Sequence, residues 1–195
     1  MSALFAFAGL MFLLYPALRP WTDETTADGA IEAMSSPAWV ASHLFAMLGF
    51  LAVSLGLLAL HGRRPGRLPL TALLTAWIGT ALVLPYYGAE DFGLHALARS
   101  PAPDLLTVVD EVRYQPVAVT MFCVGLILLA VAGITTALAT RSAAGVVFAI
   151  GYVLFLPQFF LPPVGRIAHG VILAVGCVGL AVEFRARRNR PASQR

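Results

Sequence analysis

The chain has 195 residues, of which 59% are apolar and only 12% charged, and its mean hydropathy is +0.82. Soluble domains have about a quarter of their residues charged, so this composition excludes a water-solvated globular fold and predicts a protein that uses the lipid bilayer as solvent. The net charge is only +3, and all thirteen basic residues are arginine. The lack of lysine excludes Schiff-base chemistry. We expect membrane lipids and a hydrophobic small molecule as partners, and no nucleic acid.

Six apolar runs follow one another along the chain, and we expect each to cross the membrane once. A crossing needs about 20 residues of α-helix, so six spans use most of the sequence. The first run has no positive segment before it and no convincing cleavage site after it, so we expect it to remain as an uncleaved span. The runs cover residues 3–18, 39–60, 68–87, 116–138, 143–161 and 164–182.

The arginines predict which way the spans face, because cytoplasmic loops carry an excess of basic residues. The turn 61–67 carries three arginines, the connection after the fourth span carries Arg141, and the segment 185–195 carries five. All three lie on one side of the predicted bundle. We therefore predict cytoplasmic N- and C-termini, a single six-helix transmembrane domain over residues 1–184 and an arginine-rich cytoplasmic tail over 185–195. We expect the protein in a plasma membrane, which we interpret as bacterial. The sequence leaves open whether the protein forms a homo-oligomer.

Two outer connections are long enough to form short amphipathic helices on the surface. In residues 101–116, apolar side chains recur at helical spacing after Asp104, which is suited to cap a helix. Residues 22–37 have a weaker form of this pattern. The three outward-going spans also end in similar proline-containing segments, which favours three helical hairpins of the same orientation. The predicted fold is an all-α polytopic membrane protein.

Ionisable residues gather at the outer ends of the predicted spans, where nine of the ten acidic residues and three of the four histidines lie. The predicted centre of the membrane carries no Asp, Glu or Arg. Proton and ion pathways usually place ionisable groups near the midplane, so this distribution argues against an ion-coupled transporter or channel. It favours a site that opens to the outside or to the outer leaflet.

One outer segment places a carboxylate and an imidazole on the same helical face. Tyr87, Asp91 and His95 stand at i, i+4 and i+8, provided that the helix of the third span continues beyond Gly88. Such a pair suits a metal ion, or a histidine oriented by a carboxylate for acid/base work. If the helix has already left the lipid, the two residues are simply solvated.

Two further histidines lie inside apolar runs, where an unpaired polar group is costly. Trp39 shares a face with His43 and predicts the wall of a pocket, although one interhelical hydrogen bond would explain His43 equally well. Arg166 shares a face with His169 near the start of the last span. There it would hold an anionic group or extend to the membrane surface.

These residues favour an intramembrane enzyme that acts at the outer interface on a lipid- or isoprenoid-like substrate. With zinc or another divalent metal on the histidines, a bound water would be activated; without metal, a buried carboxylic acid would protonate an alkene or epoxide. The alternatives are a haem-binding electron-transfer protein with two axial histidines, and a non-enzymatic binding or transport subunit. The candidate residues are His43, Glu90 and Asp91 as catalytic groups, Trp39, Tyr86, Tyr87 and Arg166 as substrate-binding groups, and His43, His95 and His169 as metal ligands.

Overall fold

A computed structural model describes residues 1–100 and 103–188, and every regular element within them is helical. By length and composition, four helices are able to cross a membrane: α3 (Pro37–Arg63), the continuous helix Arg67–Arg99, α7 (Pro116–Thr140) and α9 (Pro163–Arg188). Two more, α1 (Ser2–Leu18) and α8 (Ala143–Val153), are apolar but shorter. Several apolar helices of this kind are compatible with a multi-pass membrane protein.

The longer apolar helices form a closed ring. Each packs against the next in chain order, from α1 through α3, α4 (Arg67–Gly88), α7 and α8 to α9, and α9 packs against α1. Small residues allow the close approach of α4 and α7: a Cβ atom added to Gly79 would lie 2.8 Å from the carbonyl oxygen of Gly125. Close backbone approach at small residues is how helices associate in lipid.

Aromatic side chains fill the middle of this ring. Phe12 of α1 is buried and makes edge-to-face contacts with three other rings, which are those of Phe50, Tyr152 and Phe155. Their centroids lie 5.2, 6.2 and 6.1 Å from that of Phe12, within the range of favourable aromatic pairs. The interior is therefore a packed aromatic core.

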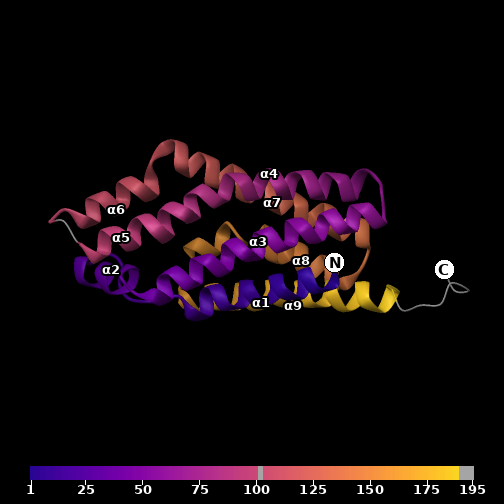
Figure 1. Cartoon of the computed structure of the whole chain (residues 1–195), viewed down its shortest axis with the longest axis horizontal. Helices are drawn as coiled ribbons and strands as arrows, with labels where there is room; N and C mark the ends of the chain where they lie inside the picture. Colours follow the sequence, from indigo (N-terminus) through magenta and orange to yellow (C-terminus); the bar gives the residue numbers. More distant parts are fainter. Residues whose placement is uncertain (101–102, 189–195) are drawn as a thin grey trace, which may run out of the picture.

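The two ends of the bundle differ in complexity (Figure 1). The N-terminus, the α3–α4 turn, the α7–α8 turn and the last turn of α9 lie together at one end, which we call the turn end. The opposite end, here named the pocket end, carries the short elements α2 (Ala27–Met34), η1 (Ala89–Gly93), α5 (Leu94–Arg99), α6 (Leu105–Tyr114) and η2 (Pro157–Phe160). Which end faces the cytoplasm stays a prediction.

The helix of the third predicted span does continue beyond Gly88, as one of the sequence interpretations required. It passes through the π-helix η1 into α5 without a break. A π-helical turn is wider than an α-helical one, so it shifts the side chains that follow relative to those before it. Glu90 and Asp91 are both buried in this segment, whereas Phe92 is 54% exposed.

The predicted fifth span, residues 143–161, is not one continuous helix. α8 ends at Val153, and the chain turns into the 3-10 helix η2 before α9 begins. Pro157 has no N–H to bond with the carbonyl of Val153, so one bond of the α-helical ladder is missing where α8 ends. The break turns this part of the chain at the pocket end.

Both predicted surface segments contain helices, α2 and α6. The hydroxyl of Thr26 accepts a hydrogen bond from the N–H of Gly29 and caps α2, whereas Asp104 stands at the N-cap of α6 without a side-chain bond. With α5 and the start of α3, these helices bury a second apolar cluster of Ala30, Ala33, Met34, Trp39, Leu94, Ala98, Leu105 and Val109. Residues 101–102 of the second segment and residues 189–195 of the predicted tail lie outside the described residues.

Candidate functional site

A pocket of about 550 Å³ opens at the pocket end of the bundle. Its walls come from α1, α3, α4, η1, α6, α7, η2 and α9, together with the segment that joins α1 to α2. One side is charged and carries the ion-paired residues Arg19, Glu24, Glu90 and Arg113. The rest of the lining is largely apolar and aromatic, with Phe122, Leu156, Phe159 and Phe160, and it includes Arg166 beside Phe159. A concave site that joins apolar walls to a few fixed polar groups is the usual form of a small-molecule site.

The charged side is organised by a chain of ion pairs. Arg113 donates from Nε to one carboxylate oxygen of Glu90 at 2.7 Å and from Nη2 to Glu24 at 2.7 Å. Arg19 binds the other oxygen of Glu24, also at 2.7 Å. These side chains are between 9% and 17% exposed, so solvent screens the pairs only in part. Burial lowers the pKa of Arg113, but the carboxylates of Glu90 and Glu24 outweigh it and raise that pKa above its usual value.

Arg166 differs from the other two arginines because no carboxylate pairs with it among the described residues. It donates from Nη2 to the carbonyl oxygen of Phe159 at 2.6 Å and from Nε to that of Leu161 at 3.2 Å. The guanidinium carbon lies 5.5 Å from the centroid of Trp21 and 5.6 Å from that of Phe159. The guanidinium is therefore fixed by backbone and rings, and it retains further N–H donors for a ligand.

His43 lines the same pocket and is held in one tautomer. Its Nδ1 lies 2.8 Å from the carbonyl oxygen of Trp39 one turn earlier in α3. A carbonyl oxygen only accepts, so Nδ1 carries the proton and Nε2 of the neutral imidazole keeps a free lone pair. The ring packs against Trp39 at 4.5 Å and against Tyr15 and Tyr87 at 5.9 Å each. No residue in the described part of the chain hydrogen-bonds to Nε2.

Five of the residues nominated from the sequence line this one pocket: His43, Tyr86, Tyr87, Glu90 and Arg166. Trp39 stands behind them, where it stacks on His43 and donates from Nε1 to the backbone carbonyl of Glu90 at 2.8 Å. The bond ties α3 to η1 and so fixes the histidine relative to the charged side.

The other three nominated residues lie outside the pocket lining. Asp91 is fully buried, and neither of its carboxylate oxygens has a hydrogen-bond partner among the described residues. His95 bonds through Nδ1 to the carbonyl oxygen of Met34 at 2.7 Å, so Asp91 does not orient it through that nitrogen. His169 bonds through Nε2 to the carbonyl oxygen of Gly151 at 2.8 Å. Each of the two histidines is accounted for by a bond to the backbone.

The three predicted metal ligands therefore have three separate backbone partners. Within residues 1–100 and 103–188, no group of three or more His, Cys, Asp or Glu side chains is arranged so that it could hold a metal ion. This arrangement gives the zinc and haem hypotheses no support, and both stay predictions.

Several residues that line the pocket were not nominated from the sequence, above all Tyr15, Arg19 and Glu24. A signal was available in the segment 15–24, where charged residues and Trp21 follow directly on the first apolar run. In the predicted topology these residues lie at the outer end of the first span, at the same level as Glu90 and Arg113.

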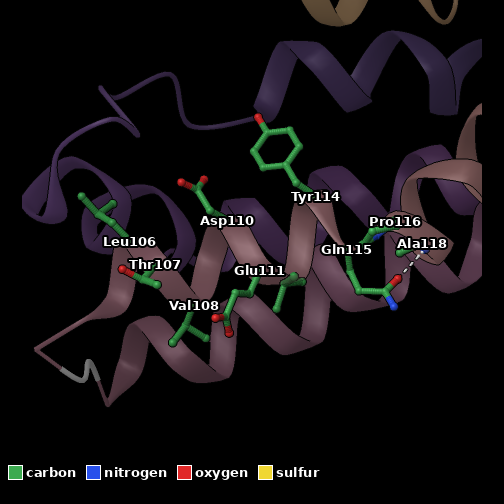
Figure 2. Close-up of a pocket in the computed structure, with 10 residues that line it drawn as sticks. Leu106, Thr107, Val108, Asp110, Glu111, Tyr114, Gln115, Pro116 and Ala118 are labelled. Atoms are coloured by element: carbon green, nitrogen blue, oxygen red, sulfur yellow. Dashed lines mark hydrogen bonds between the residues drawn. The ribbon is translucent and has the colours of Figure 1, made fainter.

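A second hollow runs along α6 and the start of α7 (Figure 2). It is lined by Asp110 and Glu111 together with apolar side chains, and by Gln115, whose side-chain oxygen accepts a hydrogen bond from the N–H of Ala118 at 2.7 Å. It includes no arginine or histidine and none of the nominated residues. We therefore place the candidate site in the pocket that contains His43.

Comparison of the chain with protein-family models, with curated proteins and with solved structures gave no match.

Proposed function

We propose that this protein is an intramembrane enzyme that uses acid/base chemistry on an amphipathic, lipid- or isoprenoid-like molecule. The observation that carries the proposal is the setting of His43. Its Nδ1 is committed to the carbonyl of Trp39, its Nε2 is free of partners among the described residues, and the ring lies in a pocket lined by both charged and aromatic residues. A neutral imidazole of fixed tautomer is the usual general base of enzymes that work near neutral pH.

The shape of the pocket supports a substrate that arrives from the lipid. Tyr114 and Phe160 both line it, yet they are 70% and 85% exposed. Leu161 and Val164, which follow η2 in the chain, are also exposed apolar residues. An apolar and aromatic rim of this kind is suited to contact acyl or isoprenoid chains while the reacting group lies deeper.

The contacts of the pocket residues suggest a different role for each in the reaction. His43 accepts a proton at Nε2 from the substrate, and the imidazolium then returns a proton to the same carbon or to a neighbouring one. Both oxygens of Glu90 are within hydrogen-bond distance of Arg113, so in this arrangement Glu90 positions the charged side. The catalytic roles assigned to Glu90 and Asp91 from the sequence stay predictions.

The topology belongs to the same proposal. We infer six spans, with α8 and η2 together making the fifth, and with the turn end and both termini in the cytoplasm of a bacterial cell. The basic residues of the α3–α4 turn and Arg141 support this orientation, because both lie at the turn end. The pocket then opens at the outer interface.

Deuterium incorporation tests the proposal even while the substrate is unidentified. The protein, in phosphatidylcholine nanodiscs, is incubated in D₂O with a total lipid extract of the expression host, and deuterium retained at carbon is measured by mass spectrometry. We expect the native protein to label one lipid class. His43→Gln should slow the labelling about 100-fold or more, the usual worth of a general base. His61→Gln, at the turn end, should label at the native rate.

Labelling by His43→Gln at the native rate would refute the proposed role of His43. Equal losses in His95→Gln and His169→Gln, with about one zinc per chain by elemental analysis, would instead favour the metal hypothesis. A Soret band after haem addition would favour the haem hypothesis.

A further inference from the structure

We propose that the molecule bound in this pocket carries a negatively charged head group, a carboxylate or a phosphate, and that Arg166 and Arg19 bind it. This inference rests on the proposed function, because it takes the pocket as the substrate site and names the class of substrate.

The charges that line the pocket do not balance. Three guanidinium groups face two carboxylates, which leaves one positive charge while His43 is neutral. An uncompensated charge in a partly buried site is costly, and a bound anion removes that cost. The pocket is therefore complementary to a ligand with a negative charge.

The excess charge belongs to Arg166. Arg113 is bound to Glu90 and Glu24, and Arg19 shares Glu24 with it, so both carboxylates are already used. Arg166 has only backbone carbonyl partners among the described residues. Two of its five N–H groups are used in this way, which leaves donors on a guanidinium whose position is already fixed.

Arg19 and Arg166 approach the same indole ring. Their guanidinium carbons lie 4.8 and 5.5 Å from the centroid of Trp21. The two guanidinium carbons are therefore no more than about 10 Å apart, a distance at which their charges repel each other and at which one anionic head group that contacts both would be attracted to each. Trp21 donates from Nε1 to the carbonyl oxygen of Pro16 at 3.1 Å, so the ring that both arginines contact is itself anchored to α1.

The rest of the pocket favours an amphiphile over a free ion. Phe122, Leu156 and Phe159 give the pocket apolar walls, and the volume of about 550 Å³ is far larger than an inorganic anion needs. Apolar walls add affinity only for a ligand with apolar surface to bury. The head group thus lies at Arg166 and Arg19, and the chain extends along the aromatic side.

Cys123 provides a built-in reporter of occupancy, because it lines the pocket and is partly exposed, whereas Cys177 is fully buried. The rate of Cys123 alkylation by N-ethylmaleimide is followed by intact-mass spectrometry, with the protein in phosphatidylcholine nanodiscs. The probes are dodecyl phosphate, dodecanoate, dodecanol, dodecyltrimethylammonium and inorganic phosphate. Cys123→Ser identifies the reacting thiol, and reaction of the second cysteine would reveal unfolding.

We expect dodecyl phosphate or dodecanoate to slow alkylation about 10-fold at concentrations at which the neutral and cationic amphiphiles change it less than about 2-fold. Arg166→Gln should raise the concentration needed for half protection about 10- to 100-fold, the usual worth of hydrogen bonds to a charged group. Arg166→Lys keeps the charge, so its concentration for half protection should lie between those of the native protein and Arg166→Gln. Arg187→Gln, on the same helix but at the turn end, should match the native protein.

Equal protection by dodecanol, or unchanged protection in Arg166→Gln, would overturn the inference. Protection by inorganic phosphate at the same concentration as dodecyl phosphate would also overturn it, since the site would then be one for free anions. The proposed function and this inference can fail separately. Anion-selective protection without deuterium labelling would support the anion site but refute the enzyme, and the protein would then be a binding protein. Labelling of a neutral lipid without anion-selective protection would support the enzyme but refute the anionic substrate class.

Discussion

At the pocket end lie three of the four ion pairs among the described residues, and they join η1, α6 and the segment between α1 and α2. In the middle of the ring the contacts are between aromatic side chains, and the helices are regular. The comparison indicates that aromatic packing holds the centre of the bundle, whereas at the pocket end ion pairs add to the apolar cluster that α2, α5 and α6 bury with α3. We therefore expect a charged ligand to change the stability of the short elements at the pocket end, and to leave the stability of the aromatic core unchanged.

The irregular elements at the pocket end explain how residues from distant parts of the chain reach one site. The π-helix η1 turns Glu90 toward Arg113, and the break at Pro157 brings Phe159 and Arg166 to the same wall. π-helical turns and broken helices are common at functional sites because they aim side chains that a regular helix would place elsewhere.

The largest effect is expected from Arg113→Ala, which leaves the carboxylate of Glu90 without its ion-pair partner and weakens the hold on Glu24. Breaking a largely buried ion pair costs about 3–5 kcal/mol. We expect amide hydrogen exchange in α2 and α6 to become on the order of 100-fold faster or more, and exchange in α8 and α9 to be unchanged. Hydrogen-exchange mass spectrometry in nanodiscs measures both regions together.

The control for this variant is the remaining described ion pair, between Glu183 and Arg187 on α9. It is an i, i+4 pair whose arginine side chain is 41% exposed, so Glu183→Gln should change stability by less than about 1 kcal/mol. Equal effects of the two variants would contradict the view that the ion pairs of Arg113 help to hold the pocket end.

Much of the fold was predictable because apolar runs and caps are local signals. The six runs correspond to the six apolar helices of the ring, and the helical spacing after Asp104 corresponds to α6. The π-helix and the break after Val153 were not predicted from these signals. Proline alone does not predict the break, because α4 continues through Pro85, and the segment 89–93 has no local signal that distinguishes a π-helix from an α-helix.

The candidate site was predictable only in part, for the same reason. His43, Glu90 and Arg166 were nominated because charged or polar residues in apolar surroundings stand out in any sequence. The convergence of Arg19 and Glu24 with Arg113 joins positions almost a hundred residues apart, and no periodicity encodes it. His95 and His169 each have a backbone carbonyl as hydrogen-bond partner, which the sequence does not reveal, and their role as metal ligands stays a prediction.

A smaller effect is expected in the aromatic core, from Phe12→Ala. The cavity left among Phe50, Tyr152 and Phe155 should cost about 3 kcal/mol, the lower end for such substitutions, because lipid is nearly as apolar as the core. Unfolding in mixed sodium dodecyl sulfate micelles measures the loss. Phe7→Ala, 43% exposed on the same helix, should cost less than about 1 kcal/mol. Weaker protection of Cys123 by dodecyl phosphate in folded Phe12→Ala would show that core and pocket are coupled.

The smallest effect, and the one that links the two regions, is expected from Trp39→Phe. The change removes the Nε1 hydrogen bond to the carbonyl of Glu90, worth about 1 kcal/mol, but keeps the backbone carbonyl that fixes His43. Because Trp39 contacts His43 and does not line the pocket, we treat it as a positioning residue. Deuterium labelling should slow about 3- to 10-fold, by the order of one lost hydrogen bond, while the dodecyl phosphate concentration for half protection of Cys123 stays within about 2-fold. If protection weakens and labelling at saturating lipid keeps its native rate, Trp39 contacts the ligand directly, as the helical face that it shares with His43 predicts.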